Sequence, residues 1–491
     1  MKEADHLELR RVLEGLNYSL TGSSLSEIGG ISYDSRTIKP GDLFVAISGM
    51  QMDGHDFVEE AVNKGASAVL VERHFSNLDL PQVVTENTRY ALGLVSANFY
   101  DHPHRKLRVL GVTGTNGKTT TTYLVKSVLE QAGYKVGLIG TIQSIIGDRA
   151  LESGRTTPES LDLQRLFSKM VDEGTDFAIM EVSSHALDLH RTAGVTFAGT
   201  LFTNLSQDHL DFHPTMDAYF AAKAKLFLSQ ECPAVLNVDD PWGVKLQVLN
   251  PSRALTYGVA EGADFRAENI QLENGGVSYI LNTEAGQIPI NLQLTGHFNV
   301  YNSLGAAALC FSQGVSLEAI KAGLQALSGV PGRFEKVEND RGLNVVVDYA
   351  HTPNGLENIL YSGRELTPDG RLIVVFGAGG DRDKSKRPLM GAVAARLADV
   401  IIITSDNPRS EEPTAICSSI EKGLLQTNSL VTYEIIVDRR TAIERAVEIA
   451  TPDDLVIVAG KGHETYQESA RGRIHFDDRE EVRRAIKELK D

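Results

Sequence analysis

Residues 114–120, Gly-Thr-Asn-Gly-Lys-Thr-Thr, have the types and the spacing that bind phosphate. Glycines let backbone N–H groups turn inward around a phosphate, the lysine can reach its oxygens, and the threonine hydroxyl can ligate Mg²⁺. An apolar run at 109–112 predicts a buried strand before the segment, and apolar residues at helical spacing predict a helix after it. Val112 stands where the strict pattern has its first glycine. We interpret the segment as a variant phosphate-binding loop that depends on Lys118 and Thr119.

A carboxylate and a histidine follow two other predicted strands. Glu181 lies in the strand predicted at 177–182, and His209 follows the strand predicted at 198–203. Ligands of open α/β sheets collect at the carboxyl ends of strands, and Mg²⁺ prefers oxygen ligands. Thr119 and Glu181 therefore suit a magnesium ion, whereas His209 by its type alone is a hydrogen-bonded loop residue. No group of His and Cys residues has the spacing of a zinc site.

A second set of charged residues lies near the C-terminus. In Ser-Asp-Asn-Pro-Arg at 405–409, Asp406 can pair with an ammonium group and Arg409 can hold a carboxylate through two parallel hydrogen bonds. A zwitterionic amino acid needs this pair of receptors, although the same residues could instead cap the helix that follows. The glycine-rich residues 377–382 fail the dinucleotide pattern at Arg382, which leaves either an anion site or a solvated charged loop.

The composition is that of an ordinary globular protein with several domains. The chain has 491 residues, of which 42% are hydrophobic and 23% charged, and its size suggests two to four domains of roughly 150 residues. A net charge of −17 argues against nucleic acid or an anionic membrane as the main partner. Three widely spaced cysteines, an N-terminus without an apolar signal core and the absence of any apolar run of about 18 residues predict a cytoplasmic protein without membrane insertion.

Strand and helix patterns alternate along the chain and predict an α/β fold. Residues 1–106 read as a small α/β domain, residues 107–332 as a domain with a parallel sheet, and residues 333–491 as a third α/β domain. Within the second domain, residues 254–296 are richer in strand signals and predict a β extension. The sequence Val-Pro-Gly-Arg-Phe at 330–334 breaks the pattern and marks the linker to the third.

Several motifs, in their order and spacing, resemble those of the Mur ligases. They are residues 114–119, 181–185, 203–211, 296–302 and 331–334. The resemblance covers nearly the whole chain and implies an N-terminal domain for a UDP-linked substrate, a central P-loop-type ATPase domain and a C-terminal Rossmann-like domain for an amino acid. Within the family, residues 406–409 look like the loop of the members that add meso-2,6-diaminopimelate, and lysine-adding members differ there.

The resemblance also implies a reaction. In that family, the free carboxylate of UDP-N-acetylmuramoyl-L-alanyl-D-glutamate attacks the γ-phosphate of ATP, and the amine of the incoming amino acid then attacks the acyl phosphate and releases phosphate. The implied catalytic residues are Lys118, Lys223 and His209. The implied metal ligands, for two Mg²⁺ ions, are Thr119, Glu181, His209 and a CO₂-derived carbamate on Lys223. The sequence itself shows Lys223 only as a lysine on the helix predicted at 218–228, and the plain interpretation of such a lysine is a solvated surface group.

The resemblance assigns the binding residues by position. Those for ATP are Gly114, Thr115, Asn116, Gly117, Lys118, Thr119, Thr120, Asn299 and Asn302. Those for the UDP-linked dipeptide are Tyr33, Ser35, Thr156, Thr157, Ser183 and Arg191, and those for diaminopimelate are Arg382, Asp406, Asn407, Pro408, Arg409, Gly460 and Glu464. Arg333 and His351 match interdomain and nucleotide positions. The chain has Leu189 where relatives often carry Gln, and Ser35 taken alone is a turn residue that bonds its own backbone.

Three alternatives remain at this stage. A lysine-adding muramyl ligase and a folylpolyglutamate-synthetase-like ligase also have a three-part organisation and an ATP-dependent reaction. The loop at 406–409 argues against both. A nucleotide-binding scaffold without catalysis is the third, and the presence of Lys118, Glu181, His209 and Lys223 argues against it. The expected partners are ATP, the UDP-linked dipeptide and the diamino acid, and the expected state is a monomer.

Overall fold

The structure is a computed structural model that describes residues 6–49, 52–152, 154–250, 254–273, 275–428 and 430–489. The chain forms two compact units. The first contains residues 1–111, 134–200 and 225–232, and the second contains residues 112–133, 201–224 and 233–491. The predicted division into three domains at 106 and 332 stays a prediction.

The first unit begins with a five-stranded sheet in the order β2-β7-β6-β5-β4. Its strands are β2 (Ser19–Thr21), β4 (Gly30–Ser32), β5 (Asp42–Val45), β6 (Ala68–Val71) and β7 (Gln82–Val84), and a short pair, β1 (Leu7–Glu8) and β3 (Glu27–Ile28), stands beside α1 (Leu9–Val12). Every residue of β5 and β6 is buried, as expected of parallel strands covered on both faces. Helices α2 (Val58–Asn63) and α3 (Thr88–Phe99) contribute to the two hydrophobic clusters of this sheet. This is the small α/β unit that the sequence predicts.

The rest of the first unit carries a mixed set of strands. They are β9 (Val136–Ile139), β10 (Gln143–Ile146), β11 (Arg149–Glu152) and β12 (Phe177–Glu181), with helices α5 (Ser160–Asp172) and α6 (Ser184–Asp188). Strands β9 and β12 run parallel, as predicted, but β10 and β11 form an antiparallel hairpin at the edge. The sheet is therefore mixed rather than purely parallel.

The second unit begins with the segment that the sequence predicts to bind phosphate, residues 114–120. Strand β8 (Arg108–Thr113) leads into the glycine loop, and α4 (Lys118–Gln131) follows it. Two further elements are shared with the first unit, β13 (Gly199–Phe202), which begins in it, and α7 (Met216–Leu228), which ends in it. The others are β14 (Ala234–Asn237), α8 (Pro241–Leu249), β15 (Ala254–Gly258), β16 (Phe265–Glu273), β17 (Gly276–Thr283), β18 (Gly286–Leu292), α9 (His297–Ser312) and α10 (Leu317–Ala326). Strands β14, β15 and β16 are parallel, and β16, β17 and β18 are antiparallel neighbours. The predicted β extension is confirmed.

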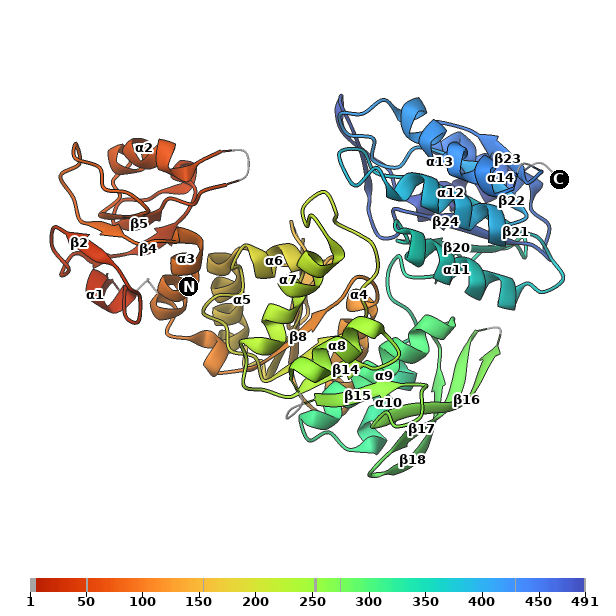
Figure 1. Cartoon of the computed structure of the whole chain (residues 1–491), viewed down its shortest axis with the longest axis horizontal. Helices are drawn as coiled ribbons and strands as arrows, with labels where there is room; N and C mark the ends of the chain where they lie inside the picture. The colour runs from red at the N-terminus through yellow and green to blue at the C-terminus, as the bar shows by residue number, and fades with distance from the viewer. Residues whose placement is uncertain are drawn as a thin grey trace. The chain divides into compact units, whose positions relative to one another are not determined.

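The C-terminal part of the second unit is a six-stranded sheet in the order β19-β20-β24-β21-β22-β23. Its strands are β19 (Glu335–Lys336), β20 (Asn344–Asp348), β21 (Leu372–Phe376), β22 (Val400–Ile403), β23 (Thr432–Ile435) and β24 (Leu455–Ala459). Helices α11 (Pro353–Leu366), α12 (Lys386–Leu397) and α13 (Pro413–Thr427) pack on one face, and α14 (Arg439–Ile449) and α15 (Asp478–Glu488) on the other (Figure 1). All strands except β19 run parallel, so their carboxyl ends share one edge, where ligands of such sheets bind.

A hairpin of β25 (Tyr466–Ser469) and β26 (Gly472–His475) follows β24 and was absent from the sequence interpretation. In the part of the chain that the structure describes, no helix is both long and apolar enough to cross a membrane.

Candidate functional site

The glycine loop between β8 and α4 has no room for side chains at its two glycines. Gly114 has φ +150° and Gly117 has φ +85°, and a Cβ on either would collide with a neighbour, the Thr203 hydroxyl or the Asn302 amide oxygen. Gly117 is also the N-cap of α4 and, as a glycine, supplies no side-chain cap to the first turn of that helix. A helix start that follows a glycine loop in this way is of the kind that binds phosphate.

The lysine of this loop folds back over the backbone. Lys118 Nζ donates to the carbonyl oxygens of Gly114 and Thr115, both at 2.9 Å. Asn204 holds the loop tip, since its side-chain oxygen accepts from the Asn116 N–H at 2.9 Å. The loop is held by these hydrogen bonds and carries the Lys118 ammonium against its backbone, so the residues present fit a nucleotide phosphate.

Lys223 is buried, which corrects the plain interpretation of a surface lysine. Its side chain on α7 is 1% exposed, donates to the Gly114 carbonyl at 2.8 Å and lies over the Tyr219 ring. Burial, aided by the charge of Lys118, holds the pKa of Lys223 well below its ordinary value. Lys225, two residues on, is exposed and pairs with Asp188. The sequence could not separate these two lysines, because α7 is apolar on most sides and a helical pattern does not say which face is covered.

Asp208 and two histidines form a charged cluster near the loop. The Asp208 carboxylate is buried, and its nearest nitrogen groups are His209 Nε2 at 3.4 Å, His351 Nε2 at 3.8 Å and the Lys386 ammonium at 3.9 Å. These groups hold the pKa of Asp208 below its usual range although burial opposes them. His209 has a left-handed backbone, φ +55°, and its ring stands edge-on to Tyr219. Of this cluster the sequence analysis named only the two histidines.

Asn302 of α9 lies against Gly117 of the loop and is bonded to Asn299 of the same helix, and the adenine contact that the resemblance implies for both residues stays a prediction. Asn302 Nδ2 donates to Asn299 Oδ1 at 2.9 Å, and Asn299 Nδ2 donates to the Thr295 carbonyl. Arg333 comes from the segment after α10, and its Nη2 donates to the Thr119 hydroxyl at 3.0 Å. The same guanidinium lies over the Tyr349 ring, 4.4 Å from its centroid.

The described residues contain no group of three or more His, Cys, Asp or Glu side chains that could form a metal cage. Mg²⁺ takes many of its ligands from water and substrate phosphates, so a lone protein hydroxyl such as Thr119 fits that ion. Glu181 belongs to the first unit, where its carboxylate accepts from the Thr141 N–H at 2.8 Å and hydroxyl at 2.9 Å. The predicted metal set of Thr119, Glu181, His209 and Lys223 remains a prediction.

The predicted dipeptide residues gather in the first unit. Thr157 Oγ1 donates to the Glu181 carbonyl and accepts from the Ser183 N–H at 3.0 Å, and Thr156 bonds Thr141 through its hydroxyl. Arg191 donates to the Thr157 carbonyl at 3.2 Å. Leu189 is the C-cap of α6.

Three guanidinium groups pair with one carboxylate among the predicted dipeptide residues, and the sequence alone did not single out this carboxylate. Glu159 is buried and pairs with Arg89, Arg155 and Arg191 at 3.1, 2.6 and 3.1 Å. Three cations around one anion leave a net positive charge, which suits an acidic substrate.

The two residues predicted for the uridine nucleotide lie in the N-terminal sheet region. Tyr33 OH donates to Asp162 Oδ2 at 2.7 Å, and burial together with that carboxylate raises the pKa of Tyr33. Ser35 is buried, and its hydroxyl donates to Glu60 at 3.2 Å rather than to its own backbone.

The segment 405–409 follows β22 at the carboxyl edge of the C-terminal sheet. Asp406 is buried; its Oδ1 accepts from the Asn407 N–H at 2.6 Å, whereas its Oδ2 has no hydrogen-bond partner. Lys461 and Arg439 hold the pKa of Asp406 below its usual value against the effect of burial. An ionised, buried carboxylate with an unused oxygen is a receptor for an ammonium group.

Arg409 stands at the other end of this segment in a left-handed conformation, φ +51°. Its Nη1 donates to the Gly380 carbonyl at 2.7 Å, and its Nε lies 3.4 Å from Glu468. Arg382 is exposed and donates to the Asp381 carbonyl. Helix α13 begins at Pro413 with Glu412 as N-cap and no side-chain capping bond, so the segment itself does not cap the helix.

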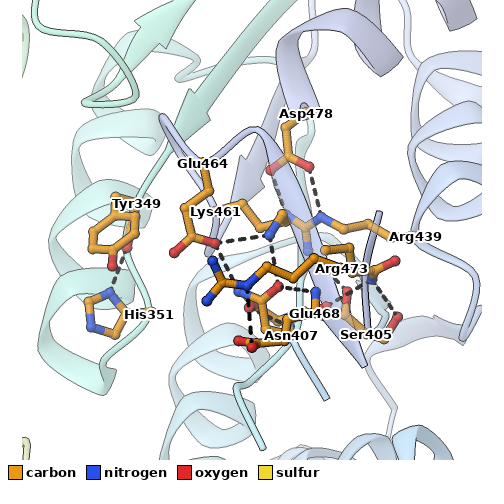
Figure 2. Close-up of polar contacts among 12 residues, drawn as sticks. Tyr349, His351, Ser405, Asn407, Arg439, Lys461, Glu464, Glu468, Arg473 and Asp478 are labelled. Carbon is orange, nitrogen blue, oxygen red and sulfur yellow. Dashed lines mark hydrogen bonds and ion pairs between the residues drawn. The ribbon is translucent and has the colours of Figure 1, made fainter. Parts of the chain in front are cut away.

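The loop after β24 completes this group (Figure 2). Lys461 is fully buried and donates to Asn407 Oδ1 at 3.1 Å and to Glu464 Oε2 at 3.0 Å, while Asn407 Nδ2 donates to Glu464 at 2.8 Å. The β25–β26 hairpin is attached to the same segment, because Gln467 donates to the Asp406 carbonyl and the Glu468 N–H donates to Asn407. The sequence alone did not assign roles to these lysine and hairpin residues, since their partners Asp406 and Asn407 are more than fifty residues away.

Three family models match the chain. A model described as "Mur ligase family, catalytic domain" matches residues 27–100, "Mur ligase middle domain" matches 112–310, and "Mur ligase, glutamate ligase domain" matches 332–462. These matches span most of the length of the chain.

Full-length relatives agree with the family models. The chain is 45% identical over 490 residues to the UDP-N-acetylmuramoyl-L-alanyl-D-glutamate--2,6-diaminopimelate ligase of Clostridium tetani, covering 98% of this chain and 100% of the relative. A solved structure of a ligase of that name is 33% identical with a TM-score of 0.69, covering 98% and 99%. A MurF ligase from Thermotoga maritima in complex with ADP is 20% identical with a TM-score of 0.62, covering 88% and 94%, and shares the fold. This chain belongs to the Mur ligase family and is a ligase.

Proposed function

We propose that the chain is the ATP-dependent ligase that adds meso-2,6-diaminopimelate to the D-glutamate of UDP-N-acetylmuramoyl-L-alanyl-D-glutamate in peptidoglycan precursor synthesis. The observation that carries the proposal is the pair of Asp406, with its unused buried oxygen, and Arg409 on one segment of the C-terminal sheet. Relatives that are 45% identical over their full length carry the name of this ligase.

The glycine loop would hold the nucleotide. The backbone N–H groups at the start of α4 would donate to phosphate oxygens, and Lys118 would exchange its two backbone carbonyls for the terminal phosphates. Asn299 and Asn302 support the loop from below and are proposed to contact the adenine side. Mg²⁺, when bound, would neutralise phosphate charge, with Thr119 as a protein ligand.

The chemistry then follows from the weakness of a carboxylate as an electrophile. Transfer of the γ-phosphoryl group to the D-glutamate carboxylate converts an oxygen into a phosphate leaving group, which the amine can displace. Such a transfer needs mainly positioning and charge neutralisation. We assign the positioning of the UDP-linked dipeptide to the first unit, with Tyr33, Ser35, Thr156, Thr157, Ser183 and Arg191 as its contacts.

Lys223 has the environment that a carbamate needs. Only a neutral amine attacks CO₂, and burial beside Lys118 favours the neutral form of Lys223. Conversion to a carbamate would replace the neutral amine by anionic oxygens of the type that Mg²⁺ prefers. We therefore keep Lys223, with Lys118 and His209, as the proposed catalytic residues.

The C-terminal group would select the amino acid. meso-Diaminopimelate carries a second carboxylate that L-lysine lacks, and Arg409 is proposed to hold a carboxylate while Asp406 holds an ammonium group. Gly460 and Glu464 border the same segment. Arg382 is exposed, so its proposed part is contact with the ligand from the solvent side.

The test is an assay of ADP release with the UDP-linked dipeptide, comparing meso-diaminopimelate with L-lysine. We expect turnover with the first and at most a trace with the second. In the same assay Arg409→Ala should raise the KM for diaminopimelate ~30-fold or more and leave that for ATP almost unchanged, because a charge-assisted bidentate contact contributes roughly 2–3 kcal/mol. Equal or better turnover with lysine would refute the substrate assignment, and an unchanged KM would remove Arg409 from the site.

We also propose that the enzyme works in the cytoplasm as a monomer. All three cysteines are buried and free, which suits a reducing compartment. Light scattering after gel filtration and fractionation of cells test these two points.

A further inference from the structure

The carboxyl edge of the C-terminal sheet contains an ion pair that is closed to solvent. Arg439 and Asp478 both have fully buried side chains, and the guanidinium donates to the carboxylate from Nε at 2.8 Å and from Nη2 at 2.7 Å (Figure 2). Arg439 is the first residue of α14 and Asp478 the first of α15, so the pair joins the starts of two helices.

The remaining hydrogen bonds of Arg439 reach two strand ends. Nη2 donates to the Ala459 carbonyl at 2.9 Å, and Nη1 donates to the Ser405 carbonyl at 3.4 Å. Ala459 is the last residue of β24 and immediately precedes Gly460, while Ser405 immediately precedes Asp406. One side chain thus fixes the backbone directly before two residues of the proposed amino-acid site.

This arrangement is costly if its purpose is stability alone. A cation at the first position of a helix opposes the helix dipole, and desolvating both members of an ion pair offsets most of their attraction. Replacing such a pair by apolar residues of similar size is often neutral or stabilising. The pair therefore has to be explained by what it holds in place.

The charge of Arg439 also bears on the carboxylate that faces the proposed ligand. Asp406 is surrounded by Lys461 after β24, Arg439 on α14, His351 after β20 and the Asn407 N–H. A Cβ at Gly460 would lie 2.5 Å from Asp406 Oδ2 and 4.0 Å from Arg439 Nη2, which places the glycine between the two charges.

Resting on the proposed function, we infer that Arg439, held by Asp478, is a positioning residue for amino-acid binding: it sets the relative place of the Asp406 and Gly460 backbones without touching the ligand. The buried side chain excludes direct contact. Its effect belongs to the amino-acid step, since its hydrogen bonds are to Asp478 and to the backbone of Ser405 and Ala459.

The decisive variant is the double replacement Arg439→Met with Asp478→Leu, which removes the pair without leaving a buried charge alone. We expect the melting temperature to stay within a few degrees of wild type, the KM for the amino acid to rise at least ~10-fold, and the KM for ATP to change less than about twofold. Arg439→Lys keeps the charge but lacks the planar fork that reaches two carbonyls, so its amino-acid KM should rise as well.

The matched control is the exposed pair of Arg445 and Glu434, which also ties α14 to the sheet. Arg445→Gln with Glu434→Gln should leave both KM values unchanged. A wild-type amino-acid KM in both Arg439 variants would overturn the inference, and so would an equal rise of both KM values in either one. If wild type instead prefers lysine, the proposed function fails, and the same comparison made with lysine as substrate still tests Arg439.

Discussion

At the scale of single residues, burial changes the chemistry that a residue type can perform. Lys223 and Lys225 lie two positions apart on α7, yet one is 1% exposed and bonded to the Gly114 carbonyl, while the other is a surface residue paired with Asp188. Desolvation lowers the pKa of the first, and a neutral amine can become a carbamate. The helix therefore contains both the lysine that we propose to form a carbamate and an exposed lysine that serves as its control.

Lys223→Ala should lower kcat at least ~100-fold, because the alanine removes a proposed metal-binding group together with the hydrogen bond to the Gly114 carbonyl. Short added carboxylates should restore part of the activity by supplying oxygen ligands. Lys225→Ala is the control and should behave as wild type. Steady-state ADP release is measured for Lys223→Ala, for the same variant with added carboxylates and for Lys225→Ala. Full activity of Lys223→Ala would show that this lysine has only a structural role.

At the scale of elements, the proposed site depends on loops that follow four parallel strands. Segments after β20, β21, β22 and β24 meet at one edge, and hydrogen bonds between them fix their positions, for example from Gly460 N–H to the Asp348 carbonyl and from Gly380 N–H to the Asn407 carbonyl. Glycines let these backbones approach closely. Gly460 has φ +117°, which other residues rarely adopt, and faces Asp406 Oδ2.

Gly460→Ala should raise the KM for the amino acid more than ~10-fold, since the added methyl group meets the carboxylate that is proposed to bind the ammonium group. Gly472→Ala separates this contact from backbone strain, because Gly472 has a similar φ of +110° but open space around its Cβ. The control should cost about 1 kcal/mol of stability and leave the KM unchanged. Equal KM effects in the two variants would show that strain, not the contact, is responsible.

At the scale of the whole molecule, each compact unit contains a histidine that is neutral in the folded state. Burial lowers the pKa of His463 in the second unit to about 3 and that of His104 in the first to about 4. The unfolded chain binds a proton at each near pH 6.5, so the folded state holds fewer protons than the unfolded state below that pH. Stability contributed by the neutral histidines is therefore present above pH 6.5 and lost as pH falls from there toward the folded pKa values.

Between pH 7 and pH 5 this loss should amount to about 2 kcal/mol for each histidine. His463→Gln should reduce the fall in melting temperature of the second unit over that range by several degrees, as followed by calorimetry. His475→Gln should not reduce it, because Glu480 raises the pKa of the exposed His475 and its protonation favours the fold at low pH. An unchanged pH dependence in His463→Gln would contradict the assignment.

The sequence by itself determined the α/β fold, the β extension at 254–296, the glycine loop before α4 and the segment 405–409, because each depends on residues that are neighbours in the chain. Apolar periodicity, glycine spacing and the order of charged residues are local signals, and they also carried the family resemblance. Tertiary structure alone decided that Lys223 is buried, that Glu159 collects three arginines and that Arg439 meets Asp478. Apart from Arg155, which lies four residues before Glu159, these facts depend on burial and on partners far apart in the sequence, which only the packing of distant elements brings together.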